Sequence, residues 1–205
     1  MVIQPYFYGV IHMRSKESTI IKFLIEHKNE ELNILKISKA LKMDYKNVYS
    51  IIKRLEKSSL VKIETFGQSS RVNLNVIVHP LVFKAEFERR TEILKDRNLA
   101  VMASNFKRGI NSKLYILLLF GSYAKKTQTK SSDIDLLFIC SDAVEDAFEK
   151  DVNRIARSMP LSLHPLVFSE SQFVEMINAK ESNVGQEALK HNVILCGIEH
   201  YYEMV

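Results

Sequence analysis

The sequence has little of what membrane proteins and disulfide-stapled domains require. Its longest unbroken apolar run, residues 114–120, is far shorter than the ~18 residues that a membrane-spanning helix needs. The only two cysteines, Cys140 and Cys196, stand in apolar surroundings without metal-ligand spacing, so we expect reduced core thiols. The first residues, MVIQPYFYGVIHMR, lack a basic leader, and we expect no secretory signal. These absences predict a cytoplasmic protein that does not contact a membrane.

Composition and charge indicate a globular chain with one basic part. Apolar residues make up 46% and charged residues 26% of the 205 positions, which argues against a disordered or low-complexity chain. This length allows one large domain or two small ones. Residues 1–76 contain 13 Lys/Arg and 7 Asp/Glu, a net charge of +6, whereas residues 77–205 contain 16 and 17, a net charge of −1. The basic third favours either a nucleic-acid surface or a merely solvated lysine-rich surface.

Three helices are predicted within the basic third. Ser18 is a suitable cap for a helix to about residue 27, a second helix fits 34–41, and a third fits 45–58. Apolar residues at helical spacing mark the buried side of the third helix, namely Val48, Ile51, Ile52 and Leu55. Its other side is polar and basic, and is suited to a DNA major groove.

Two strands with alternating apolar residues follow, around a predicted turn at 67–70. The segment LKISKALKMDYKNVYSIIKRLEKSSLVKIETFGQSSRVNLN resembles the winged helix-turn-helix family of DNA-binding domains. Winged helices also serve as protein-binding or structural modules, so this alternative stays open. The resemblance implies a set of DNA-facing residues on the third helix and a wing-tip arginine: Tyr45, Lys46, Asn47, Ser50, Lys53, Arg54 and Arg71.

A helical connection is predicted between the two halves of the chain. Pro80 marks a helix start, and no further proline or glycine occurs before residue 109. Apolar residues recur here at spacings of four and seven, and we interpret this stripe as core or as a dimer contact: Phe83, Phe87, Leu94 and Val101. A homodimer would suit DNA binding, because paired domains match paired half-sites.

Two carboxylates and a glycine-serine turn form the clearest candidate for chemistry. A strand-like run over 113–120 ends in Gly121-Ser122, and a second over 134–140 begins within Asp133-Ile134-Asp135. Side chains at i and i+2 of a strand share a face, so Asp133 and Asp135 are expected side by side. Such a pair needs a compensating charge, and Mg²⁺ prefers oxygen ligands of this kind together with substrate phosphates. A lone Asp-x-Asp is otherwise a solvated strand end.

The combination LLFGSYAKKTQTKSSDIDLLF resembles the signature of the DNA polymerase β-like nucleotidyltransferase superfamily, in particular its minimal members, over about residues 80–205. The resemblance implies a small mixed sheet, a triphosphate held at Gly121 and Ser122, and Asp133 and Asp135 as ligands of Mg²⁺. It implies attack of a hydroxyl on the α-phosphorus of a nucleoside triphosphate such as ATP. Lys125 and Lys126 stand where the family often has Arg-Gly, and they are candidate phosphate contacts.

The chain departs from that pattern at a third acidic position. Many active members have a carboxylate on a following strand, where this sequence has His164. His164 is therefore a possible third site residue, acting as a proton acceptor, or a strand histidine without a role. Asp142 and Glu170 are possible substitutes by reach alone.

The predicted fold class is α+β, with a winged helix-turn-helix over 1–79, a connecting helical segment over 80–110, and a small mixed-sheet nucleotidyltransferase domain over 111–205. The leading hypothesis is a Mg²⁺-dependent nucleotidyltransferase fused to a module for double-stranded DNA. The alternative is a transcription regulator or antitoxin-like protein whose degenerate domain serves as nucleotide sensor or dimer scaffold. A weaker option is an interaction adaptor. The resemblance also implies a possible helical protein partner.

Overall fold

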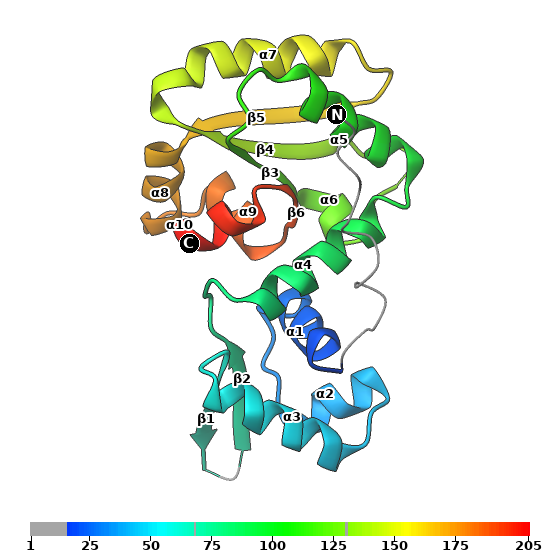
Figure 1. Ribbon diagram of the computed structural model, residues 1–205, viewed down its shortest axis with the longest axis vertical. Helices are drawn as coiled ribbons and strands as arrows, with labels where there is room; N and C mark the ends of the chain where they lie inside the picture. The colour runs from blue at the N-terminus through cyan, green and yellow to red at the C-terminus, as the bar shows by residue number, and fades with distance from the viewer. Residues whose placement is uncertain (1–15, 68, 130) are drawn as a thin grey trace, which may run out of the picture. The chain divides into compact units, whose positions relative to one another are not determined.

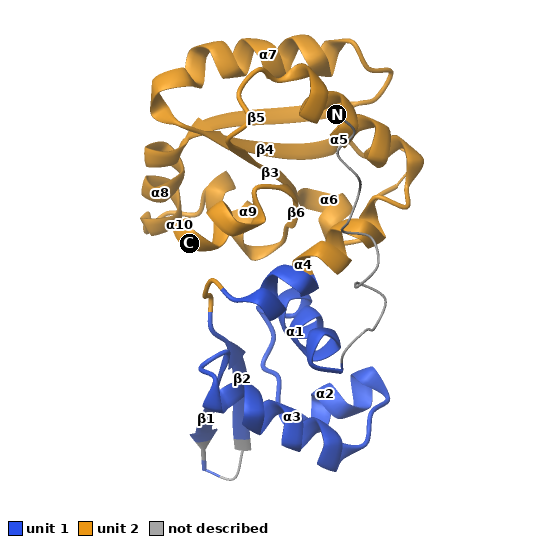
Figure 2. Ribbon diagram, in the orientation of Figure 1, with its two compact units in different colours: residues 1–75, 79–85 blue, residues 76–78, 86–205 orange. Residues whose placement is uncertain are grey.

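The computed structural model describes residues 16–205 except 68 and 130. The chain divides into two compact units (Figure 2), the first comprising residues up to 75 with 79–85, and the second residues 76–78 with 86–205. The expectation about a secretory leader concerns residues that lie outside the described part. No helix within the described part is long and apolar enough to cross a bilayer.

In its described residues, unit 1 contains three helices followed by a two-stranded antiparallel hairpin (Figure 1), together with the first residues of a fourth helix that begins at Pro80. The side chains of Asn33 and Asp44 cap the second and third helices by accepting hydrogen bonds from backbone N–H groups. Ser18 lies buried inside the first helix and is not its cap, because the helix begins two residues earlier. The elements are α1 Lys16–Glu26, α2 Ile34–Leu41, α3 Tyr45–Lys57, β1 Val61–Phe66 and β2 Ser69–Leu74.

The apolar side of α3 is buried as its spacing predicts, with Val48 and Ile52 fully inaccessible. Helix α3 contacts α2 and β1 in the core of unit 1. The turn of the hairpin is shorter than expected, since Ser69 and Ser70 already belong to β2 and pair with residues of β1. Gly67 supplies the positive φ, +59°, that this tight turn requires.

The connecting segment forms two helices, α4 Pro80–Ile93 and α5 Arg97–Gly109, and α5 is capped by the Asp96 side chain. The predicted apolar stripe holds in part, because Phe83 and Phe87 are partly buried and Leu94 packs against the hydrophobic core of unit 2. It is wrong at Val101, because the break between the helices changes the face that α5 buries. Val101 is half exposed, and α5 instead buries Leu99, Met102 and Phe106.

The second unit contains a mixed four-stranded sheet in the order β5-β4-β3-β6. Strand β3 runs antiparallel to both neighbours, and β4 runs parallel to β5. Pro165 lies within β5, which is compatible with the edge of a sheet because proline has no N–H to donate. The strands are β3 Tyr115–Leu119, β4 Ile134–Cys140, β5 Leu163–Ser169 and β6 Val193–Cys196.

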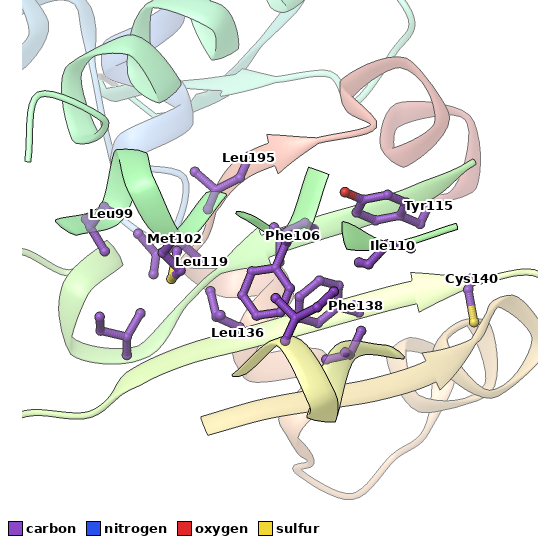
Figure 3. Close-up of a cluster of buried hydrophobic side chains, with 14 of the residues drawn as sticks. Leu99, Met102, Phe106, Ile110, Tyr115, Leu119, Leu136, Phe138, Cys140 and Leu195 are labelled. Carbon is purple, nitrogen blue, oxygen red and sulfur yellow. The ribbon is translucent and has the colours of Figure 1, made fainter. Parts of the chain in front are cut away.

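One face of this sheet carries the main core of unit 2 (Figure 3). Phe106 of α5 meets Phe138 of β4 edge to face, with ring centroids 4.9 Å apart. Helix α7, Glu145–Arg157, covers the same face with Phe148, Val152 and Ile155. Cys140 lies in this core, where burial raises the pKa of its thiol to about 11, and neither cysteine forms a disulfide.

The remaining helices follow the strands. Helix α8 contacts β4 and β5 and begins at a capping box formed by Ser169 and Gln172, and α10 contacts β3. Alternation along β4 sends Asp135, Leu137 and Ile139 to the face opposite the main core. The short elements are α6 Gly121–Ala124, the 3-10 turn Asp142–Val144, α8 Glu170–Asn178, α9 Val184–Lys190 and α10 Ile198–Met204.

A buried polar network ties α4 to the C-terminal part of unit 2. The Arg89 guanidinium donates to Glu86 Oε2 over 2.6 Å and to the carbonyl of Asn192, and Tyr202 donates to Glu86 Oε1 over 2.7 Å. Burial and the Glu86 carboxylate raise the pKa of Tyr202, so its hydroxyl stays protonated and can donate.

We expect Arg89→Met to lower the free energy of unfolding by about 3–5 kcal/mol, because it leaves the Glu86 charge buried without its partner. Arg154→Met is the matched control, since Arg154 is exposed and its pair with Asp151 should contribute less than about 1 kcal/mol. Urea unfolding of both variants measures the difference, and similar losses in the two would contradict this account.

Candidate functional site

The turn after β3 provides the first component of the site. The chain leaves β3 at Leu119, and Gly121 adopts a φ of +64° at the start of the short helix α6. Ser122 follows, half-buried, and its carbonyl accepts a hydrogen bond from the Thr127 N–H over 3.0 Å. Within the described part of the chain the Ser122 hydroxyl has no hydrogen-bond partner, so it is available to a ligand.

The carboxylate of Asp135 lies directly against this turn. An ideal Cβ on Gly121 would stand 2.1 Å from Asp135 Oδ2, so the absence of a side chain at Gly121 makes room for the carboxylate. The backbone holds the same pair together, because the Phe120 N–H donates to the Asp135 carbonyl over 3.1 Å. The structure therefore brings together the turn and one of the two predicted acids.

The second acid, Asp133, is exposed immediately before β4. Its Oδ1 accepts a hydrogen bond from the Ser162 hydroxyl. Asp135 Oδ1 lies 3.2 Å from His164 Nδ1, and the register of the parallel pair places His164 opposite Asp135. Asp133 and Asp135 are called the acid pair below.

The two predicted phosphate-binding lysines follow α6 and both have carboxylate partners. Lys125 Nζ lies 3.1 Å from Glu187 of α9, and Lys126 Nζ lies 3.8 Å from Glu92 of α4. Lys126 has a φ of +58°, a conformation that glycine adopts without strain. This positive φ explains why a glycine suits this position in the family that the sequence resembles. Lys126 adopts the same backbone conformation although it has a side chain.

Asp142 and Glu170 do not substitute for a third acid. Both follow the far ends of β4 and β5, and the five residues of β4 after Asp135 alone span about 17 Å at 3.3 Å per residue. They line a separate cavity of about 680 Å³ with His200. In the described residues, no three His, Cys, Asp or Glu side chains form a group that could hold a metal ion by themselves.

The predicted DNA-facing residues of unit 1 are partly neutralised. Arg54 pairs with Glu17 of α1 over 2.9 Å and Lys53 with Glu56 over 2.8 Å. Arg71 lies inside β2 opposite Glu64, with a longer contact of 3.9 Å to Glu31, so it does not stand at the tip. The start of α3 is more open, and the predicted residues that are exposed there are Tyr45, Lys46, Asn47 and Ser50.

Sequence reasoning missed one residue of this surface. Tyr49 is 46% exposed, and its ring stacks on that of Tyr45 with centroids 6.4 Å apart. The spacing of four between two tyrosines on a helix was the available signal.

Residues 106–200 match the family model described as polymerase beta nucleotidyltransferase. Neither the curated proteins nor the solved structures give a match to the chain. The matched region contains the whole sheet, the turn at Gly121 and the acid pair, and it confirms the nucleotidyltransferase part of the sequence-based prediction. The winged-helix assignment of unit 1 stays a prediction.

Replacing Gly121 by alanine should destabilise the protein more than the same change at Gly67. Both glycines have a positive φ, which costs about 1–2 kcal/mol for a residue with a side chain. A Cβ at Gly67 meets nothing within 4 Å, whereas a Cβ at Gly121 collides with Asp135. Chemical unfolding of the two variants measures the difference, and equal losses would show that Asp135 moves aside without cost.

Proposed function

We propose that the second unit binds a nucleoside triphosphate with Mg²⁺ and transfers its nucleotidyl group to an acceptor hydroxyl. The observation that carries this proposal is the close approach of the Asp135 carboxylate to the turn at Gly121. This contact places the negatively charged Asp135 carboxylate next to the backbone of Gly121, which a phosphate group can approach closely because glycine has no side chain. The family match over residues 106–200 supports the same class of reaction.

The chemistry of the donors fits Mg²⁺ bound jointly by protein and substrate. The acid pair offers hard oxygen ligands, and Mg²⁺ commonly takes one or two carboxylates together with phosphate oxygens and water. No third protein ligand completes a group among the described residues, so phosphate oxygens of the substrate and water supply the remaining ligands. When bound, the ion would neutralise the negative charge that develops on the phosphoryl oxygens.

The residues of the chain then have separable tasks. Gly121 and the Ser122 hydroxyl hold the triphosphate, and Lys125 and Lys126 exchange exposed carboxylate partners for phosphate oxygens. The acceptor oxygen forms a bond to the α-phosphorus as the bond between the α-phosphorus and the bridging oxygen breaks. Pyrophosphate leaves with that oxygen, and the proton of the acceptor hydroxyl passes to solvent or to a basic side chain.

One observation favours a second candidate function. The strand neighbour of Asp135 is the imidazole of His164, not a third carboxylate, and imidazole is a poor ligand for Mg²⁺. A site of this kind can hold nucleotide without turning it over. In that case the unit acts as a nucleotide sensor or dimer scaffold for a DNA-binding regulator or an antitoxin-like protein.

For unit 1 we propose binding of double-stranded DNA through the exposed side of α3. The net charge of +6 over residues 1–76 and the order of three helices and a hairpin support this proposal. Tyr45, Lys46 and Tyr49 are its leading contacts, because Arg54 and Lys53 are held by acids of the same unit. A homodimer and a helical protein partner remain predictions.

The double variant Asp133→Asn, Asp135→Asn should lose Mg²⁺-dependent binding of an ATP analogue. It should also lower transfer of label from ATP by about a hundredfold or more, the scale of losing groups that stabilise transition-state charge. Asp146→Asn with Glu149→Gln on the exposed side of α7 makes the same charge change as a control. Undiminished binding in the first variant would refute the site, and binding without any transfer in the wild-type protein would favour the sensor.

Removing the Lys46 side chain should weaken DNA binding. We expect Lys46→Ala to reduce the slope of log affinity against log salt by about one, the value for one lost phosphate contact. Arg54→Ala should change the slope less because Arg54 is paired with Glu17. Lys150→Ala in the second unit is the control, and fluorescence anisotropy with a random duplex at several salt concentrations provides the measurement. Equal slopes for Lys46→Ala and the control would exclude this surface.

A further inference from the structure

Two side chains opposite the acid pair have no task in the nucleotidyl transfer proposed above. The parallel register pairs Ile134 with Leu163 and Asp135 with His164, and the Ile134 N–H donates to the Ser162 carbonyl over 2.9 Å. The same register, extended by one residue, places Ser162 beside Asp133. Ser162 and His164 are thus separated by two positions, like the acids, and share their face of the sheet.

Each of these residues hydrogen-bonds one oxygen of one acid. The Ser162 hydroxyl donates to Asp133 Oδ1, and His164 Nδ1 is 3.2 Å from Asp135 Oδ1. An ionised carboxylate can only accept hydrogen bonds, so His164 Nδ1 is the donor in this contact. Each contact thus places a hydrogen-bond donor from the β5 side against one carboxylate oxygen.

The Oδ2 atoms of Asp133 and Asp135 do not take part in these two hydrogen bonds. Asp135 Oδ2 lies in the space that a Cβ of Gly121 would occupy, next to the turn proposed to hold phosphate. Asp133 Oδ2 has no hydrogen-bond partner within the described part of the chain. Each carboxylate therefore presents one oxygen to a ligand while its other oxygen is anchored to the β5 side.

We propose that Ser162 and His164 are positioning residues that fix the orientation of the acid pair for a divalent cation. The inference rests on the proposed function, because it concerns the same site. Without the anchors each aspartate samples other rotamers, and binding a cation then carries the entropic cost of ordering two side chains. Residues that orient metal ligands in this way affect metal affinity although they do not touch the metal.

The test is binding of Mn²⁺ alone, followed by the loss of the free-ion electron paramagnetic resonance signal. Ser162→Ala should weaken Mn²⁺ binding about tenfold, near the lower end for residues that orient metal ligands, because the anchoring bond is exposed. Ser162→Thr keeps the hydroxyl and should restore wild-type affinity. Thermal unfolding of each variant checks that the fold is retained.

His164 offers a sharper comparison because the two amide side chains imitate its two nitrogens. The substitution His164→Asn places an N–H near the position of Nδ1, and His164→Gln places one near the position of Nε2. We expect His164→Asn to keep Mn²⁺ affinity within about threefold of wild type and His164→Gln to lose about tenfold. The reverse order would mean that Nε2 is the working atom and would overturn the positioning role.

The outcomes separate the inference from the function on which it rests. If Asp133→Asn with Asp135→Asn abolishes Mn²⁺ binding while Ser162→Ala and His164→Gln bind as the wild type does, the positioning role is wrong and the site stands. If the double aspartate variant binds Mn²⁺ as well as the wild type, the proposed function itself fails. Weakened binding in Ser162→Ala that Ser162→Thr restores supports the inference.

Discussion

The second unit depends on a close contact between a backbone without a side chain and a carboxylate. Gly121 and Asp135 face each other at the end of the antiparallel pair of β3 and β4, and the carboxylate fills the volume that a methyl group would need. The hydrophobic core on the opposite face holds the two strands in this register, with Leu119 paired to Leu136. Because successive side chains of β4 point to opposite faces of the sheet, the packing of Leu136 in the core also fixes the position of Asp135 in the site.

The positive charge of unit 1 is partly balanced by acidic side chains of the same unit. The sequence predicts a basic face on α3, and the structure shows that Arg54 of this helix pairs with Glu17 of α1 and Lys53 pairs with Glu56 of α3 itself. Exposed ion pairs of this kind contribute little to stability. Their effect is to concentrate the remaining positive and aromatic surface at the start of α3.

Local signals made part of the second unit predictable, and contacts between distant residues explain most of the rest. The bounds of β4 follow from an apolar run between polar residues, and α8 follows from the capping box that begins at Ser169. Helix α7 was missed although its buried apolar residues recur at spacings of four and three. The spacing of the stripe over 83–101 does not show the helix break at Asp96, whose side chain caps α5. The partners of Lys125 and Asp133 lie 62 and 29 positions away, and no local pattern encodes such pairings.

The edge strand β5 has a consequence for association between copies of the chain. Pro165 interrupts its outer row of backbone donors, and a proline at an edge leaves an incoming strand one hydrogen bond short. Continuous growth of the sheet by a neighbouring molecule is thereby disfavoured along the border that carries Ser162 and His164. The same proline thus discourages fibre-like stacking of the sheet.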